Sequence, residues 1–235
     1  MRRITMRPMA INLITESMSS LADEIAQFMT QHAQRAPERF AIIREVVADM
    51  QRKNVDGNAT KLGDCVADFT LPNALGHSVS LSDRLAQGPV VLVFYRGGWC
   101  PYCNFQLRAM QSALAEIQAL GASLMAISPQ PPDASLPTQE KNALSFEVLS
   151  DVGSTVIRHW HLAYEMAEAL REPYLKAGYD LPTINGQGDW VLPITATYVI
   201  APDHTVTWAW VDEDHMVRPD AGDVLDALRL LRPTN

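Results

Sequence analysis

Short apolar runs along this chain alternate with longer segments in which apolar residues recur at helical spacing. Residues 90–95 form a continuous β-branched and aromatic run, typical of a buried strand. From residue 104 to about residue 121 apolar side chains return every three or four positions, which predicts an amphipathic helix. Residues 122–128 are apolar again. A strand, a helix and a strand in this order predict a β-α-β unit with parallel neighbouring strands.

The N-terminal part of the chain shows a purely helical pattern. Residues 19–53 predict two helices: Ser20 caps the first, with Asp23 three residues on, and Pro37 takes the first position of the second. We interpret residues 1–18 as a loose leader and residues 19–58 as a helical extension. The extension is expected to dock either on the core or on a second subunit, and the second arrangement would make the protein a homodimer.

The main domain is expected to span residues 60–235. Its order of elements predicts an α/β fold, a mixed sheet with helices on both faces. Four of the 15 prolines fall in residues 129–137, which predicts a loop there. Residues 161–192 are the least readable part, with a helix expected over 166–176 and a turn at 185–188. The remaining expected elements are a hairpin over 63–82, a helix at 82–87, a helix at 138–144, a strand at 146–149, a helix at 152–160, a hairpin of strands 195–201 and 205–211, and a closing helix from residue 219.

Composition narrows the classes of protein. The formal net charge of −8, with no basic block, argues against nucleic-acid binding. No apolar run approaches the roughly 18 residues of a transmembrane helix, so no membrane span is expected. Three cysteines are too few for a secreted disulfide framework. These features predict a cytoplasmic protein.

Two cysteines lie where the apolar strand gives way to the helix, in the sequence Trp-Cys-Pro-Tyr-Cys of residues 99–103. The N–H groups and positive dipole end of a helix favour thiolate over thiol, so Cys100 is the expected nucleophile, with a lowered pKa. Cys103 follows one turn later, with Cβ atoms about 5–6 Å apart. A disulfide needs about 3.5–4.5 Å. A small adjustment of the helix end would therefore let Cys103 resolve an oxidised Cys100.

The other candidate groups favour structural interpretations. Cys65 has no evident partner and is expected to be a spare thiol, with a distant resolving cysteine as the alternative. His159 and His161 would complete a zinc site with the paired cysteines, but no second ligand pair has the usual spacing. Residues 212–215, Asp-Glu-Asp-His, are expected to form a solvated loop. No phosphate loop or nucleotide fingerprint occurs, so neither a metal nor another cofactor is expected.

The cysteine pair stands among further stretches that carry a family resemblance: Gly63-Asp64, residues 68–71, residues 90–103 with Phe-Tyr-Arg-Gly-Gly-Trp before Cys100, Ala-Ile-Ser-Pro at 126–129, residues 197–203, and Val211-Asp212. Over roughly residues 60–232 the chain resembles the thioredoxin fold. More narrowly, it is similar to the peroxiredoxin-like branch of the AhpC/TSA superfamily. The resemblance implies a hydroperoxide substrate and a thioredoxin-like or other dithiol reductant.

Two departures from the family pattern concern the predicted site. The pattern places Pro seven residues, and Thr or Ser three residues, before the reactive cysteine; here Val93 and Gly97 stand there. The family also has an Arg just before a late core strand, where this chain has Thr195, at the place of the cis-proline of thioredoxins. Arg96 would supply the missing charge, tuning the thiolate or binding a substrate anion, or else is a solvated loop residue. Trp99 is either an apolar platform for a substrate or partner, or simple packing.

The resemblance implies a thiol-dependent peroxidase, and the residues themselves support a redox cycle of two cysteines. Cys100 would become a sulfenic acid, Cys103 would resolve it, and an external dithiol such as thioredoxin would restore both thiols. The alternative is a thiol–disulfide oxidoreductase with little peroxidase activity, which the residues at 97 and 195 favour. A third possibility is a non-enzymatic redox sensor or a zinc-stabilised interaction module.

Overall fold

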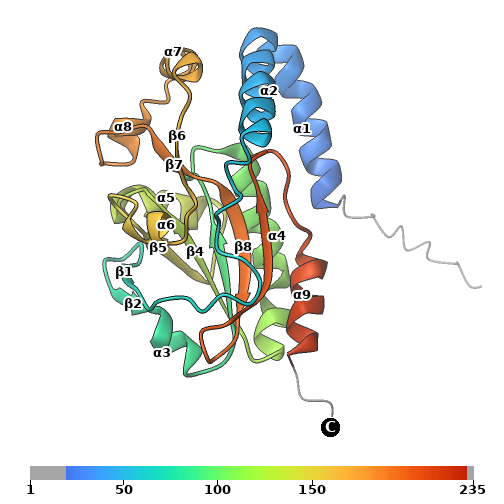
Figure 1. The fold of residues 1–235 in the computed structure, drawn as a ribbon, viewed down its shortest axis with the longest axis vertical. Coiled ribbons are helices and arrows are strands. Elements are labelled where there is room, and N and C mark those ends of the chain that lie inside the picture. The colour runs from blue at the N-terminus through green and yellow to red at the C-terminus, as the bar shows by residue number, and fades with distance from the viewer. Residues whose placement is uncertain (1–19, 232–235) are drawn as a thin grey trace, which may run out of the picture.

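A five-stranded mixed sheet forms the centre of the molecule (Figure 1). The computed structural model describes residues 20–231, so the predicted leader lies outside the described residues. The strand order is β5-β4-β3-β8-β9. Their bounds are β3 Val90–Phe94, β4 Ser123–Ser128, β5 Glu147–Ser150, β8 Thr195–Ile200 and β9 Val206–Asp212. β3, β4 and β5 are parallel, whereas β8 is antiparallel to both β3 and β9, which confirms the predicted mixed sheet.

Both faces of the central strand β3 are buried, as its unbroken apolar run predicts. Val91 and Val93 face one core, packed with α4 (Pro101–Ala119) and α9 (Ala221–Leu230), which lie side by side (Figure 1). Leu92 and Phe94 face the opposite core, with α3 (Leu81–Leu85) and α6 (Thr155–His159). Since successive side chains of a strand point to opposite faces, this arrangement places helices on both sides of the sheet.

The N-terminal extension is a pair of helices, α1 (Leu21–Arg35) and α2 (Pro37–Arg52). Ser20 and Asp23 form a reciprocal capping box, and Pro37 stands in the first turn of α2, as predicted. α1 packs on α4, and α2 packs on α7 (Glu168–Lys176). Ile25 and Ile43 enter the same core as β3. The extension therefore docks on its own main domain.

The prediction of a loop over residues 129–137 is wrong for residues 132–137, which are helical. α5 (Pro132–Lys141) begins inside it, with Pro132 in the first turn and Pro137 in the helix interior. A proline in the first turn removes no hydrogen bond, but Pro137 does. Tertiary contacts hold the helix, because α5 packs on β5 and the hydroxyls of Ser135 and Ser150 lie 3.1 Å apart in the interior.

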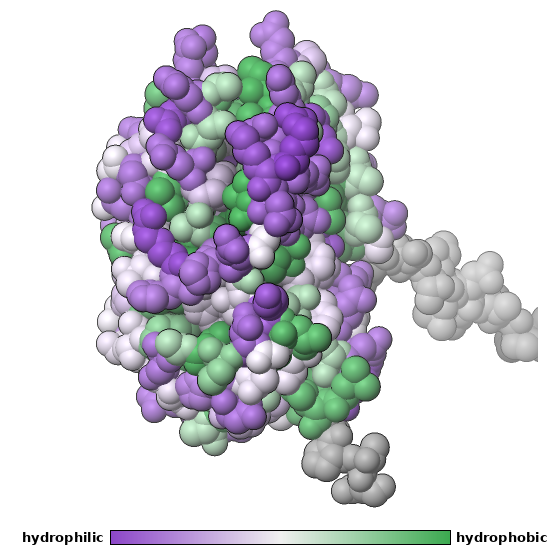
Figure 2. Space-filling model, viewed as in Figure 1, coloured by the Kyte–Doolittle hydropathy of each residue, from purple (hydrophilic) through white to green (hydrophobic). Residues whose placement is uncertain are grey.

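Smaller elements complete the molecule. The predicted hairpin is present as β1 (Thr70–Pro72) and β2 (Ser78–Ser80). The least readable segment contains β6 (Ala163–Glu165), the predicted helix α7, α8 (Leu181–Ile184) and β7 (Val191–Pro193); β6 and β7 pair with each other. Hydrophilic side chains predominate over α2 and α7 at the top of Figure 2. Among the described residues, no helix is long and apolar enough to cross a membrane.

Candidate active site

The paired cysteines lie at the junction of β3 and α4, as predicted. Cys100 is the N-cap residue of α4, and Pro101 occupies the first turn, where its missing N–H removes no hydrogen bond. Asn104, one turn on, donates its side-chain amide to the carbonyl oxygens of Gly98 (2.8 Å) and Cys100 (3.0 Å). The bond to Gly98 ties the start of the helix to the loop before it. Both cysteines are free thiols.

The two sulfurs lie within hydrogen-bonding distance, with the Cys100 thiol donating to the Cys103 sulfur. Nη2 of Arg218 lies 3.4 Å from Sγ of Cys103, and the backbone N–H of Arg96 donates to the same sulfur. Burial alone would raise the pKa of Cys103. The hydrogen bond from Cys100 and the charge of Arg218 outweigh burial and lower this pKa to about 5.

The prediction of a lowered pKa at Cys100 is therefore wrong for the structure as it stands. Cys100 is only 1% exposed, and burial, followed by the hydrogen bond to Cys103, raises its pKa well above the usual range. The helix start cannot compensate for this loss of solvation. The two thiols act on each other's ionisation, so the acidity belongs to both sulfurs together.

Cys100 nevertheless borders open space. It lines a cavity of about 190 Å³, whereas Cys103 is not among the lining residues. The cavity walls come from the extension, from the β3–α4 junction, from the region of α7 and from the loop after β9: Phe28, Gln31, His32, Arg35, Arg39, Ile43, Arg96, Trp99, Cys100, Pro101, Tyr102, Tyr174, Tyr179 and His215. A small molecule in this cavity would meet the first sulfur and not the second.

Arg96 lines the same cavity and is 2% exposed, so the solvated-loop interpretation is wrong. Its guanidinium carbon lies 5.0 Å from the ring centroid of Trp99, and its Nη2 donates to the hydroxyl of Tyr174 at 3.4 Å. Its positive charge favours thiolate at both cysteines, against the larger effect of their burial. Trp99 is half-buried, with its ring against Tyr174 and Tyr179, and is part of the cavity wall.

The backbone explains why position 97 departs from the family pattern. Gly97 has φ +138°, a region that residues with a Cβ rarely adopt. A Cβ there would lie 2.5 Å from Nε1 of Trp99 and 2.9 Å from Oε1 of Gln130. A threonine hydroxyl therefore has no room three residues before Cys100 in this site.

Thr195, the other departure, begins β8 and pairs with Asp212 of β9. Its hydroxyl is directed to the strand partner, donating to the carbonyl oxygen of Asp212 at 3.3 Å. It is buried and does not line the cavity. Within residues 20–231 there is no cis peptide bond, so the cis-proline feature of thioredoxins has no counterpart there.

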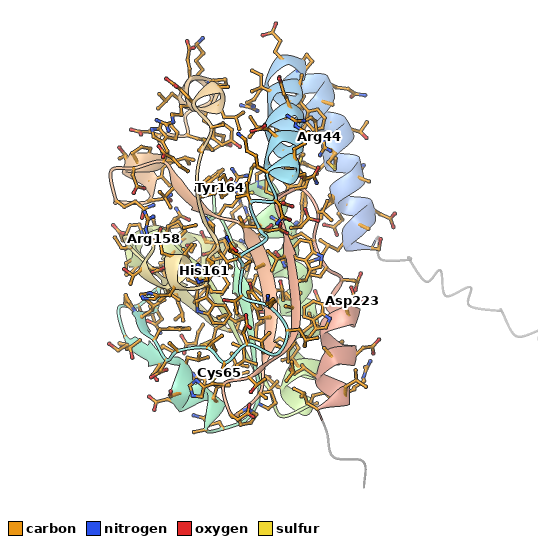
Figure 3. All side chains as sticks on the ribbon, in the orientation of Figure 1. Arg44, Cys65, Arg158, His161, Tyr164 and Asp223 are labelled. Atoms are coloured by element: carbon orange, nitrogen blue, oxygen red, sulfur yellow. The ribbon has the colours of Figure 1, made fainter. Side chains whose placement is uncertain are left out.

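The sequence interpretation missed the loop after β9. Residues 212–215 were expected to be solvated, yet Asp214 and His215 are only 5% and 8% exposed. Asp214 forms an ion pair with Arg44, which Figure 3 labels on α2. Arg218, from the same loop, reaches Cys103. No periodic pattern or motif marks these residues, because only tertiary packing brings them to the site.

The third cysteine lies elsewhere. Cys65 is exposed and lies at the opposite end of the molecule from Arg44 (Figure 3). Together with His159 and His161 it lines a separate cavity, away from the paired cysteines. Over the described stretch, no three His, Cys, Asp or Glu side chains converge in a way that would hold a metal ion. The zinc alternative therefore has no support from the arrangement of these residues.

Comparisons with known proteins agree with this arrangement. A model of the AhpC/TSA family matches residues 62–209. A putative peroxiredoxin of Mycobacterium tuberculosis H37Rv is 35% identical over 96 residues, which is 41% of this chain and 62% of the relative. Peroxiredoxin Bcp of Escherichia coli K12 is 35% identical over 95 residues, 40% of this chain and 60% of the relative. The chain thus spans less than two thirds of the length of these relatives.

Solved structures extend the likeness beyond the aligned sequence. The crystal structure of peroxidoxin BcpB from Mycobacterium tuberculosis has a TM-score of 0.59 and 26% identity, covering 74% of this chain and 99% of that one. A PrxQ mutant from Xylella fastidiosa, at 17% identity and a TM-score of 0.58, shares the fold. The family match runs from before β1 into β9, contains both cysteines of the β3–α4 junction, and takes up more than half of the chain. The resemblance read from the sequence is thereby confirmed, and the chain belongs to the AhpC/TSA family.

Proposed function

We propose that this protein is a thiol-dependent peroxidase in which Cys100 reacts with hydroperoxides. The observation that carries the proposal is the asymmetry of the pair: Cys100 alone lines the cavity, while Cys103 lies behind it, hydrogen-bonded to it and in contact with Arg218. Because the Cys100 sulfur borders the cavity, a small hydroperoxide that enters the cavity can reach it.

The first step oxidises Cys100. Cys103, as the thiolate, takes the proton of the Cys100 thiol, and the Cys100 sulfur attacks the terminal oxygen of the hydroperoxide. The O–O bond breaks, an S–O bond forms, and the alkoxide leaves and takes up a proton as the alcohol. Arg96 lies beside this charge, and its guanidinium favours negative sulfur. The cysteine is thereby oxidised to a sulfenic acid.

The second step forms the disulfide. The Cys103 sulfur attacks the sulfenic sulfur of Cys100, an S–S bond forms, the S–O bond breaks, and water leaves. An external dithiol such as thioredoxin then reduces this disulfide through a mixed disulfide and is itself oxidised.

We further propose that the protein is cytoplasmic and forms a homodimer. We also propose that the chain divides into an extension of residues 19–58 and a main domain of residues 60–235.

The alternative, a thiol–disulfide oxidoreductase with little peroxidase activity, has one observation in its favour. Gly97 removes the hydroxyl that the family pattern places beside the peroxide, and the geometry leaves no room for a replacement. The two functions differ in what oxidises Cys100, a hydroperoxide or a protein disulfide. They are therefore separated by comparing rates with the two oxidants.

The test is hydrogen peroxide consumption, coupled to a thioredoxin system and, in parallel, to dithiothreitol. Wild type, Cys100→Ser, Cys103→Ser and, as a matched control, Cys65→Ser are compared. We expect turnover in wild type and Cys65→Ser, none in Cys100→Ser, and a single oxidation without disulfide turnover in Cys103→Ser. Full activity in Cys100→Ser would refute the proposal. Slow peroxide turnover beside rapid reduction of a protein disulfide would favour the alternative.

A further inference from the structure

The cavity in front of Cys100 is far larger than a peroxide group needs. One ordered water requires about 10–15 Å³ of such space. The cavity offers about 190 Å³, which is room for an organic molecule. Much of its wall comes from the extension, including Phe28, whose ring packs edge-on against Tyr102 at a centroid distance of 5.3 Å.

The charge of this wall is opposite to that of the whole protein. The chain has 27 acidic and 19 basic residues, yet the described residues that line the cavity include no Asp or Glu and three arginines: Arg35, Arg39 and Arg96. Among the described residues, Arg35 and Arg39 take part in no ion pair. Arg35 is exposed, Arg39 is half-buried and Arg96 is buried, so positive charge runs from the mouth of the cavity to its floor.

The histidines of the wall do not share this charge. Burial, followed by the charge of Arg39, lowers the pKa of His32, and burial, followed by the charge of Arg96, lowers that of His215 well below its usual range. Nη2 of Arg39 lies 3.4 Å from Nε2 of His32, and a guanidinium can only donate, so Nε2 accepts. Nδ1–H of His32 then donates to the hydroxyl of Tyr102 at 3.2 Å. Near neutral pH the arginines alone carry the positive charge.

From these features we infer that the cavity selects organic hydroperoxides that carry a carboxylate. The carboxylate binds Arg35 and Arg39 at the mouth, the apolar body lies against Phe28 and the other aromatic rings, and the peroxide group reaches Cys100 beside Arg96. Guanidinium groups bind carboxylates through charge-assisted, often bidentate hydrogen bonds. This inference rests on the proposed peroxidase function, and it names the substrate class of the same site.

A matched pair of substrates tests it: cumene hydroperoxide bearing a para carboxylate, and the methyl ester of that compound. The two differ in charge and share the reacting group. The measurement is the ratio of kcat/KM for the acid to that for the ester, which cancels any general loss of active protein. We expect a ratio of about tenfold or more in wild type and close to one in Arg35→Gln/Arg39→Gln. The wild-type ratio is expected in Arg52→Gln, which changes an exposed arginine of α2 that is paired with Asp49.

Carboxylate binding can also be measured without peroxide turnover, as protection of Cys100 from alkylation. The unreactive para-isopropylbenzoate should slow alkylation of Cys100 in wild type and not in the double variant, and the corresponding amide should slow it in neither. A ratio near one in wild type, or an unchanged preference in the double variant, would overturn the inference and leave the peroxidase function standing. Failure of wild type to reduce any hydroperoxide would overturn the peroxidase function, and the alkylation assay would still decide whether carboxylates bind.

Discussion

The β3–α4 junction and the α1–α2 extension contribute different things to one cavity. The junction lies inside the segment that matches the AhpC/TSA family and supplies both sulfurs. The extension lies outside that segment and supplies an aromatic and cationic wall, including Phe28, Arg35 and Arg39. In the functions proposed above, the junction carries the reacting thiol, and the extension selects the molecules that reach it.

The two regions are joined through the loop after β9. Arg44 of α2 pairs with the buried carboxylate of Asp214, and Arg218 of the same loop contacts Cys103. His32 of α1 bonds the hydroxyl of Tyr102, which lies between the two cysteines in sequence. A substitution in the extension can therefore affect the two thiols through the Arg44–Asp214 ion pair, the loop that carries Arg218, or the bond from His32 to Tyr102.

The largest expected effect concerns which sulfur is ionised. In Cys100→Ser the serine hydroxyl can still donate to Cys103, so one thiolate should appear with a midpoint near the wild-type value of about 5. In Cys103→Ser the remaining Cys100 is buried and lacks the contact with Arg218, so its thiolate should appear only above the usual range. Thiolate absorbance in the ultraviolet, followed against pH, measures both midpoints.

The control for this titration is Cys65→Ser, which leaves the pair intact and should keep the low midpoint. The opposite pattern, a low midpoint in Cys103→Ser and a high one in Cys100→Ser, would place the stabilised thiolate on Cys100, the N-cap residue of α4. The two sulfurs would then have the roles that the helix dipole alone predicts.

The next effect is expected from Gly97→Thr, which restores the residue of the family pattern. The left-handed backbone costs about 1–3 kcal/mol for a residue with a Cβ. The added atoms also collide with Trp99, a wall of the cavity. We therefore expect lower stability in denaturant and a loss of peroxide turnover. Gly76→Thr is the matched control, since Gly76 also has a positive φ (+81°) but nothing within 4 Å of its Cβ position. Higher turnover in Gly97→Thr would contradict the geometry of this junction.

Arg218→Gln should have a smaller effect that depends on pH. Loss of the guanidinium beside Cys103 raises the pKa of that thiol, so ionisation requires a higher pH. A rise of one unit lowers the thiolate fraction about tenfold below the wild-type midpoint and hardly at all well above it. The acid limb of the peroxide-reduction rate should move upward while the rate near pH 8 stays close to wild type. Arg158→Gln, exposed and paired with Asp189, is the control, and an unmoved acid limb in Arg218→Gln would exclude this role.

The smallest effect is expected from Arg44→Gln, which tests the link between the two regions. The Arg44 side chain is 43% exposed, so the ion pair with Asp214 is worth only about 0.2–1 kcal/mol. A small loss of stability should accompany a small rise in the thiolate midpoint, because the loop that carries Arg218 is held less firmly. Arg52→Gln, whose partner Asp49 is exposed, should change neither quantity. A midpoint identical to wild type in Arg44→Gln would show that the extension and the thiol pair act independently.

Much of the fold was predictable because its signals are local. The run at 90–95 marks β3, and Ser20 with Asp23 marks the start of α1. The helix expected at 138–144 overlaps only the end of α5 (Pro132–Lys141), because Pro137 opposes a helix locally and packing on β5 outweighs that preference. The β6–β7 pair was not predicted because α7 and α8 lie between its strands, so no tight turn marks the two strands as partners.

The sequence by itself determined the strand-to-helix junction and the spacing of its two thiols, since both follow from neighbouring residues and helix geometry. Only the tertiary structure decided which thiol faces the cavity and which charged side chains act on the pair. Ionisation of a buried sulfur depends on solvent exclusion and on charges brought from distant positions, such as Arg218 and Arg96. No local sequence pattern predicts this solvent exclusion or these charges, because both arise only when separate segments pack together.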